Sequence, residues 1–180
     1  MWVGWCCIRY RSQRGQAVLE LAFQIPLMMA LLFGAVQIGR IFYTYHTLQK
    51  AIRGGAGLLA RSVNVGYCPA DARVSDPIIV DAVNFAIYGN LQGLGTPVVP
   101  GLTPDMIQVV PERNTSGTVT PCTCSDATDT NSCSTANGGR PPDFIVMNLP
   151  NGFPLSIPFP FINIGTINLR VSVRMPVTGM

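Results

Sequence analysis

An uncharged apolar run near the N-terminus constrains this chain more than any other feature. Residues 21–39 hold 19 positions without a charged side chain. A helix with a rise of about 1.5 Å per residue would make this run about 28 Å long, close to the bilayer hydrocarbon thickness of about 30 Å. Only 12% of the residues are charged, about half the usual share of about 25%. The run therefore predicts one membrane-spanning helix.

A secretory signal peptide and a plain membrane anchor are the simplest alternatives. Arg9, Arg11 and Arg14 precede the run, as in the basic region of a signal peptide. However, the run exceeds the usual apolar length of a signal peptide, and no A-x-A cleavage site follows it. Basic residues lie on both sides of the run, so they do not decide its orientation.

The N-terminal edge of the run favours a more specific interpretation. Glu20 lies at this edge, where an ionised carboxylate is costly and is by default a functional candidate. The sequence R-G-Q-A-V-L-E ends at this glutamate, and it resembles the leader junction of type III prepilins. The resemblance implies a basic leader over residues 1–15, cleavage between Gly15 and Gln16, and a role for Glu20 in subunit assembly.

The resemblance extends through residues 15–60. Pro26 follows Glu20 by six residues, and the segments G-A-V-Q-I-G-R at 34–40 and L-Q-K-A-I-R-G-G-A at 48–56 come next. In this order and spacing they resemble the N-terminal region of TadE-like pseudopilins of the tight-adherence (Flp) pilus system. The chain departs from that family at Leu21, where an aromatic residue is usual, and at Gln37, where an acid is frequent.

The resemblance implies a membrane-anchored structural subunit, a minor pseudopilin for assembly of a tight-adherence type IV pilus. Its partners would be a prepilin peptidase, other pilin or pseudopilin subunits, the pilus assembly platform and the membrane. It would cross the bacterial inner membrane once, with a cytoplasmic N-terminus and a periplasmic head. Two alternatives stay open: a pseudopilin of another secretion or DNA-uptake system, and a membrane-anchored envelope protein whose head binds a ligand.

The helical pattern continues beyond the apolar run and predicts one long helix over residues 16–62. Pro26 should kink or locally break this helix, because proline lacks an N–H and clashes with the preceding turn. Gly54, Gly55 and Gly57 either permit close approach of another backbone or mark fraying. The apolar positions recur at helical spacing; they are Ile38, Phe42, Tyr45, Leu48, Ile52, Ala56 and Leu59.

Residues 63–180 predict a small α+β head with one further helix and an antiparallel sheet. Ser75-Asp76-Pro77 is a helix-start signal, a capping side chain followed by proline in the first turn, and Gly89-Asn90 can end that helix. The expected elements are a helix over Pro77–Tyr88, strands over Met106–Val110, Phe144–Leu149 and Ile167–Met175, an exposed polar loop over 113–142, and an irregular or edge segment over 150–160.

The cysteines divide by their place relative to the apolar run. Cys6 and Cys7 precede it and should stay reduced in the cytoplasm. Four others follow it and suggest two disulfides in an oxidising compartment, with three connectivities open; they are Cys68, Cys122, Cys124 and Cys133. Cys122 and Cys124 are unfavourable partners because one residue separates them. Zinc binding is the alternative, but C-x-C lacks the usual zinc spacing, and we expect no metal site.

The composition argues against several other functions. The formal net charge of +3 comes without a basic patch interleaved with aromatic residues, so we expect no nucleic-acid partner. His46 is the single histidine, which leaves little room for a histidine-based metal centre or triad. The chain has no nucleophile-elbow, P-loop or zinc-protease motif. We therefore expect no enzyme activity, no cofactor and no small-molecule substrate.

Overall fold

The computed structural model describes residues 14–63, 65–68, 76–124, 129, 131–133, 139–159 and 162–178. The chain divides into two compact units, Met1–Arg40 and Ile41–Met180, and each is described by itself. Most of the predicted leader, including Cys6 and Cys7, lies outside the described residues.

Helix α1 (Arg14–Arg61) is the dominant element of the first unit and continues into the second. In the first unit nearly all of its side chains are exposed. Among the described residues it is the one helix that is long and apolar enough to cross a membrane. Pro26 lies inside α1 and does not end it, so the local break expected there is absent, while the kink stays a prediction.

In the second unit, α1 contributes one buried stripe to the core. Leu48, Ile52, Ala56 and Leu59 are fully buried, whereas Phe42 is 60% exposed. The predicted stripe is therefore correct from about Tyr45, which packs partly buried against the core. Burial of each large aliphatic side chain contributes about 1.5–3 kcal/mol relative to its exposure.

Helix α3 (Pro77–Tyr88) has the bounds that the sequence predicts. Asp76 caps its N-terminus, with Oδ1 accepting a hydrogen bond from the Ile78 N–H at 2.8 Å. Gly89 ends the helix with a φ of +72°, a left-handed conformation that glycine adopts without a Cβ penalty. The buried face of α3 consists of Ile79, Ala82, Val83, Ala86 and Ile87.

Gly55 permits the close approach of α1 to α3. A Cβ atom added to Gly55 would lie 2.7 Å from the Ala82 carbonyl oxygen and 2.9 Å from the Ala86 Cβ. At Gly57, by contrast, an added Cβ would meet no atom within 4 Å. Of the two explanations that the sequence left open, close approach is correct for Gly55.

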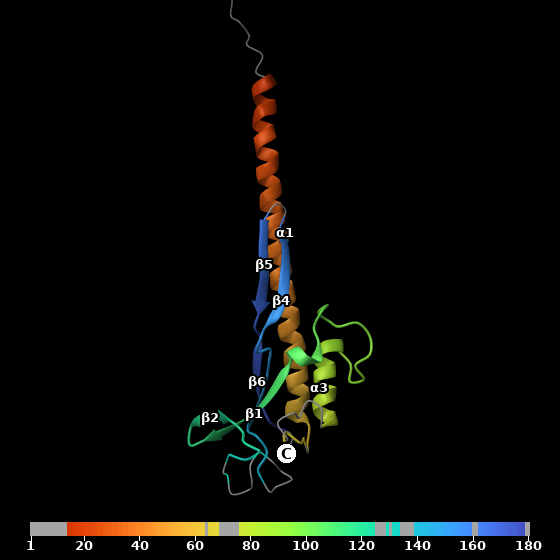
Figure 1. The fold of residues 1–180 in the computed structure, drawn as a ribbon, viewed down its shortest axis with the longest axis vertical. Coiled ribbons are helices and arrows are strands. Elements are labelled where there is room, and N and C mark those ends of the chain that lie inside the picture. The colour runs from red at the N-terminus through yellow and green to blue at the C-terminus, as the bar shows by residue number, and fades with distance from the viewer. Residues whose placement is uncertain are drawn as a thin grey trace, which may run out of the picture. The chain divides into compact units, whose positions relative to one another are not determined.

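The larger sheet has the strand order β2-β1-β3-β6, and its pairs are antiparallel. Its strands are β1 (Gln108–Thr115), β2 (Thr118–Pro121), β3 (Phe144–Asn148) and β6 (Ser172–Pro176), and the short 3-10 helix η1 (Pro104–Met106) precedes β1. Figure 1 shows this sheet with α3 and the second-unit part of α1. The predicted α+β class is therefore confirmed: a long apolar helix, one further helix and an antiparallel sheet.

Of the two predictions for residues 150–180, one is correct and one was wrong. The proline-containing segment 150–160 holds an edge strand, which is one of its two predicted forms: β4 (Phe153–Phe159) pairs antiparallel with β5 (Ile162–Leu169) in a separate two-stranded sheet. Each strand of such a sheet has one unpaired edge, where proline removes no ladder hydrogen bond. The alternating run Ile167–Met175 is divided between β5 and β6 rather than forming one strand.

The polar segment 113–142 was predicted as one exposed loop, and this too was wrong for its beginning. Strand β1 extends to Thr115 and turns through Ser116 and Gly117 into β2. Both turn residues have positive φ, +53° and +88°, as a tight hairpin requires. Polar residues fit here because β2 is an edge strand with an exposed or half-buried pattern.

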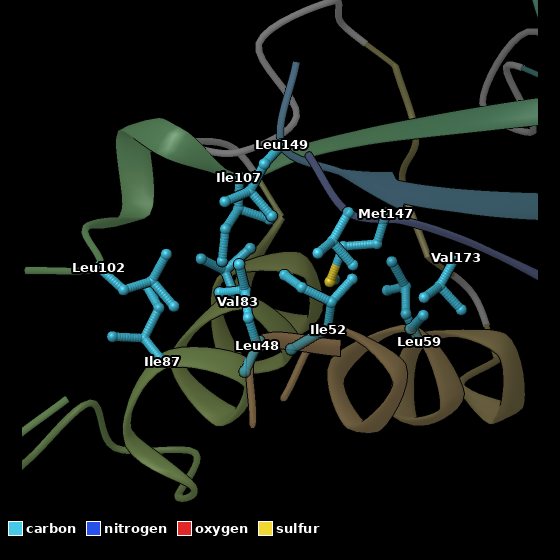
Figure 2. Close-up of a cluster of buried hydrophobic side chains, with 14 of the residues drawn as sticks. Leu48, Ile52, Leu59, Val83, Ile87, Leu102, Ile107, Met147, Leu149 and Val173 are labelled. Carbon is cyan, nitrogen blue, oxygen red and sulfur yellow. The ribbon is translucent and has the colours of Figure 1, made fainter. Parts of the chain in front are cut away.

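The core of the second unit lies between its helices and the larger sheet. Figure 2 shows side chains of α1 and α3 in one cluster with Met147 of β3 and Val173 of β6. Leu102, Ile107 and Leu149 extend the same cluster from the segments that flank the strands. The core thus joins residues that are distant in sequence.

We predict that Gly55→Ala destabilises the second unit by about 1–3 kcal/mol, because the new methyl group would overlap α3. Thermal unfolding of the full chain in detergent should show the loss. Gly57→Ala is the matched control and should be neutral, or stabilising by up to about 1 kcal/mol through helix propensity. Equal effects of the two substitutions would contradict the close approach.

Candidate functional site: the start of α1 and the cysteine cluster

The predicted cleavage residues lie in the first turn of α1. Gly15 and Gln16 are exposed, and a Cβ added to Gly15 would meet no atom within 4 Å. The first N–H groups of a helix have no partner within it, and glycine weakens a helix by about 1 kcal/mol. The first turn is therefore held by fewer hydrogen bonds than the turns that follow.

Glu20 lies one helical turn after Gln16. It is exposed and is the one acidic residue of α1. Four residues of helix correspond to a rise of about 6 Å and place both positions on the same face. An amine generated at Gln16 would therefore be a neighbour of the Glu20 carboxylate.

The first unit presents a large apolar surface around this helix. Val18 and Phe23 are 67% and 74% exposed, and the apolar side chains of the following turns are also exposed. Contiguous exposed apolar surface of this kind marks an interaction with lipid or protein. Together with the length and composition of α1, it supports membrane anchoring.

In the head, the structure pairs the four predicted cysteines as Cys68–Cys124 and Cys122–Cys133. The Cα–Cα distance is 5.6 Å in each pair, within the usual range of about 4.4–6.8 Å for a disulfide. Backbone hydrogen bonds hold the segments together, including Cys133 N–H to Thr123 O at 3.0 Å. This is one of the three connectivities that the sequence left open.

Arg113 is a buried residue that the sequence analysis missed. It is 2% exposed, and its guanidinium donates to the carbonyl oxygens of Ser132 at 2.7 Å, Pro141 at 3.0 Å and Arg140. Burial, and then the charge of Arg140, lower its pKa. One guanidinium nitrogen also lies 3.4 Å from Cys133 Sγ. Arg113 therefore connects β1 to the disulfide-bonded segment. No periodic signal distinguishes it from the exposed polar residues around it.

Two further polar side chains, His46 and Asp129, have ordinary surroundings. His46 is exposed on α1, beside the Tyr45 ring. Asp129 accepts hydrogen bonds from Thr123 Oγ1 at 2.5 Å and from the Asn131 N–H at 2.9 Å, as in an ordinary turn. Within the described ranges, no three histidine, cysteine or acidic side chains are grouped to hold a metal ion.

A comparison with known protein families matches the N-terminal part of the chain. The family described as TadE-like protein matches residues 15–56, which confirms the resemblance over the segment that holds Gly15, Glu20 and most of α1. No curated protein and no solved structure matches the chain. The similarity to this family therefore covers the N-terminal segment, residues 15–56.

We predict that Arg113→Met lowers the free energy of unfolding of the head by about 1–3 kcal/mol, since buried carbonyl groups would lose their donor. Urea unfolding of the full chain in detergent tests this. The matched control is Arg140→Met, which removes a side chain that is 70% exposed and 3.9 Å from Asp143 and should cost less than about 0.5 kcal/mol. A similar loss in both variants would contradict the role of Arg113.

A second prediction concerns the cysteine pairs. Non-reducing peptide mapping of protein isolated from the envelope should recover peptides linked by Cys68–Cys124 and by Cys122–Cys133. Cys68→Ser should leave Cys124 as a free thiol and keep the other pair. Four free thiols, or another pairing in the wild-type chain, would contradict the structure.

Proposed function

We propose that this chain is a TadE-like minor pseudopilin, a membrane-anchored structural subunit in the assembly of a tight-adherence pilus. The family match over residues 15–56 carries this proposal. It is supported by the coincidence of that segment with a helix that is apolar, exposed and long enough to span a bilayer.

In this proposal a prepilin peptidase cuts between Gly15 and Gln16. The cut removes the basic leader and creates an ammonium group one turn from Glu20. The span stays in the bacterial inner membrane, and the head faces the periplasm, where its two disulfides can form. The chain acts as a substrate and a subunit, without catalysis of its own.

In pilus assembly, the Glu20 carboxylate pairs with an ammonium group. A lone carboxylate near lipid is costly, and an ammonium group beside it recovers part of that cost. The N-terminal amine of an adjacent subunit can provide that ammonium group and thereby set the register between two apolar helices. Other pilin-like subunits and the assembly platform are the partners that this role requires.

We predict that the mature chain begins at Gln16. Mass spectrometry of the protein from cells with an active prepilin peptidase should find that N-terminus. Gly15→Leu should block the cut, because a bulky side chain replaces the residue before it, whereas Gly39→Leu, also in an open position of α1, should leave the cut intact. A mature chain that begins at another residue would contradict the proposed cleavage between Gly15 and Gln16.

We also predict that Glu20→Gln leaves membrane insertion and cleavage intact but reduces pilus assembly at least tenfold, since the amide cannot neutralise the ammonium group. Surface pilus yield and subunit cross-linking measure the effect. Gln24→Ala, one turn further along α1, is the control and should assemble normally. Normal assembly by the fully processed Glu20→Gln protein would instead favour a carboxylate that is merely solvated at the membrane surface.

A further inference from the structure

An open groove of about 610 Å³ lies on the second unit, beside the C-terminal turns of α1. Its residues include Arg53, Gly57, Leu58 and Arg61 of α1, with Phe85 of α3 and Met175 of β6. An added Cβ at Gly57 would enter empty space, so the missing side chain helps to keep the groove open.

The two arginines give this groove a charge that the described structure does not neutralise. Both are exposed, no ion pair joins either one to a described acid, and the lining holds no acidic residue. They are eight residues apart, which is about 12 Å along a helix. Between them, the lining consists mainly of glycine and apolar side chains.

We propose that this groove binds an acidic, amphipathic helix of a partner protein. Two carboxylates about two helical turns apart on that helix would pair with Arg53 and Arg61, and apolar side chains between them would cover Leu58, Phe85 and Met175. Helices commonly bind in apolar grooves through anchors of this spacing, and bidentate pairing makes arginine well suited to carboxylates.

The geometry favours this occupant over two others. The phosphate headgroup of one lipid offers a single anionic group, whereas the groove has two arginines whose backbone positions are about 12 Å apart along α1. A helix from a second copy of this chain also fits poorly. Helix α1 contains Glu20 as its one acid and α3 contains Asp81 as its one acid, so neither presents two carboxylates at the required spacing.

The test uses the full chain in its own cells, with a photoreactive amino acid at Gly57, where an added side chain has room. After irradiation, the cross-linked peptide is identified by mass spectrometry. We expect a segment of another protein with acidic residues seven or eight apart. Arg53→Glu combined with Arg61→Glu should lower the cross-linked yield at least tenfold, whereas Arg170→Glu, exposed and outside the groove, should change it less than twofold.

Charge rescue is the second arm. Lysines in place of the two partner acids should restore the cross-link to the Arg53→Glu, Arg61→Glu chain. Cross-links to lipid, to a second copy or to a peptide without paired acids would overturn the inference. So would the absence of any cross-link, or an unchanged cross-linked yield after the charge reversal. This readout does not depend on leader cleavage, so it can fail while the proposed function stands.

Discussion

The packing of α1 against α3 and the larger sheet is the interaction on which the rest of the head depends. The α1 stripe from Leu48 to Leu59 is fully buried, and Gly55 brings the α1 backbone against Ala82 and Ala86. This contact requires a helix that is amphipathic after about residue 45, whereas before residue 40 the side chains of α1 are mostly apolar and exposed. The sequence of α1 therefore changes from an apolar pattern in its first part to an amphipathic pattern where it packs in the core.

Local patterns in the sequence predicted the elements that rest on local chemistry. The α3 bounds followed from the Ser75-Asp76-Pro77 start and the Gly89-Asn90 end, because capping depends on neighbouring residues. The stripe on α1 followed from its helical period. The split of Ile167–Met175 into two strands could not be predicted, since the same alternation continues through the break and the choice of partner strand is tertiary.

Some residues of the candidate site could be predicted from the sequence and others could not. Gly15 and Glu20 belong to one short motif, so predicting them required no tertiary information. Arg113 looked like the first residue of a polar loop, but the disulfide-bonded segment covers it with backbone carbonyl groups. Its burial depends on Cys133 and Pro141, which lie 20 and 28 residues later in the chain. A polar sequence pattern does not predict such a long-range contact.

The central claim is that α1 is a lipid-facing span in its first half and a core helix in its second. A photoactivatable reagent that partitions into the bilayer tests it most directly, applied to the full chain in membranes and read by peptide mass spectrometry. We expect labelling of residues 21–39 and none of the buried face at Leu48, Ile52 and Leu59. Labelling of that face, or none over residues 21–39, would contradict it.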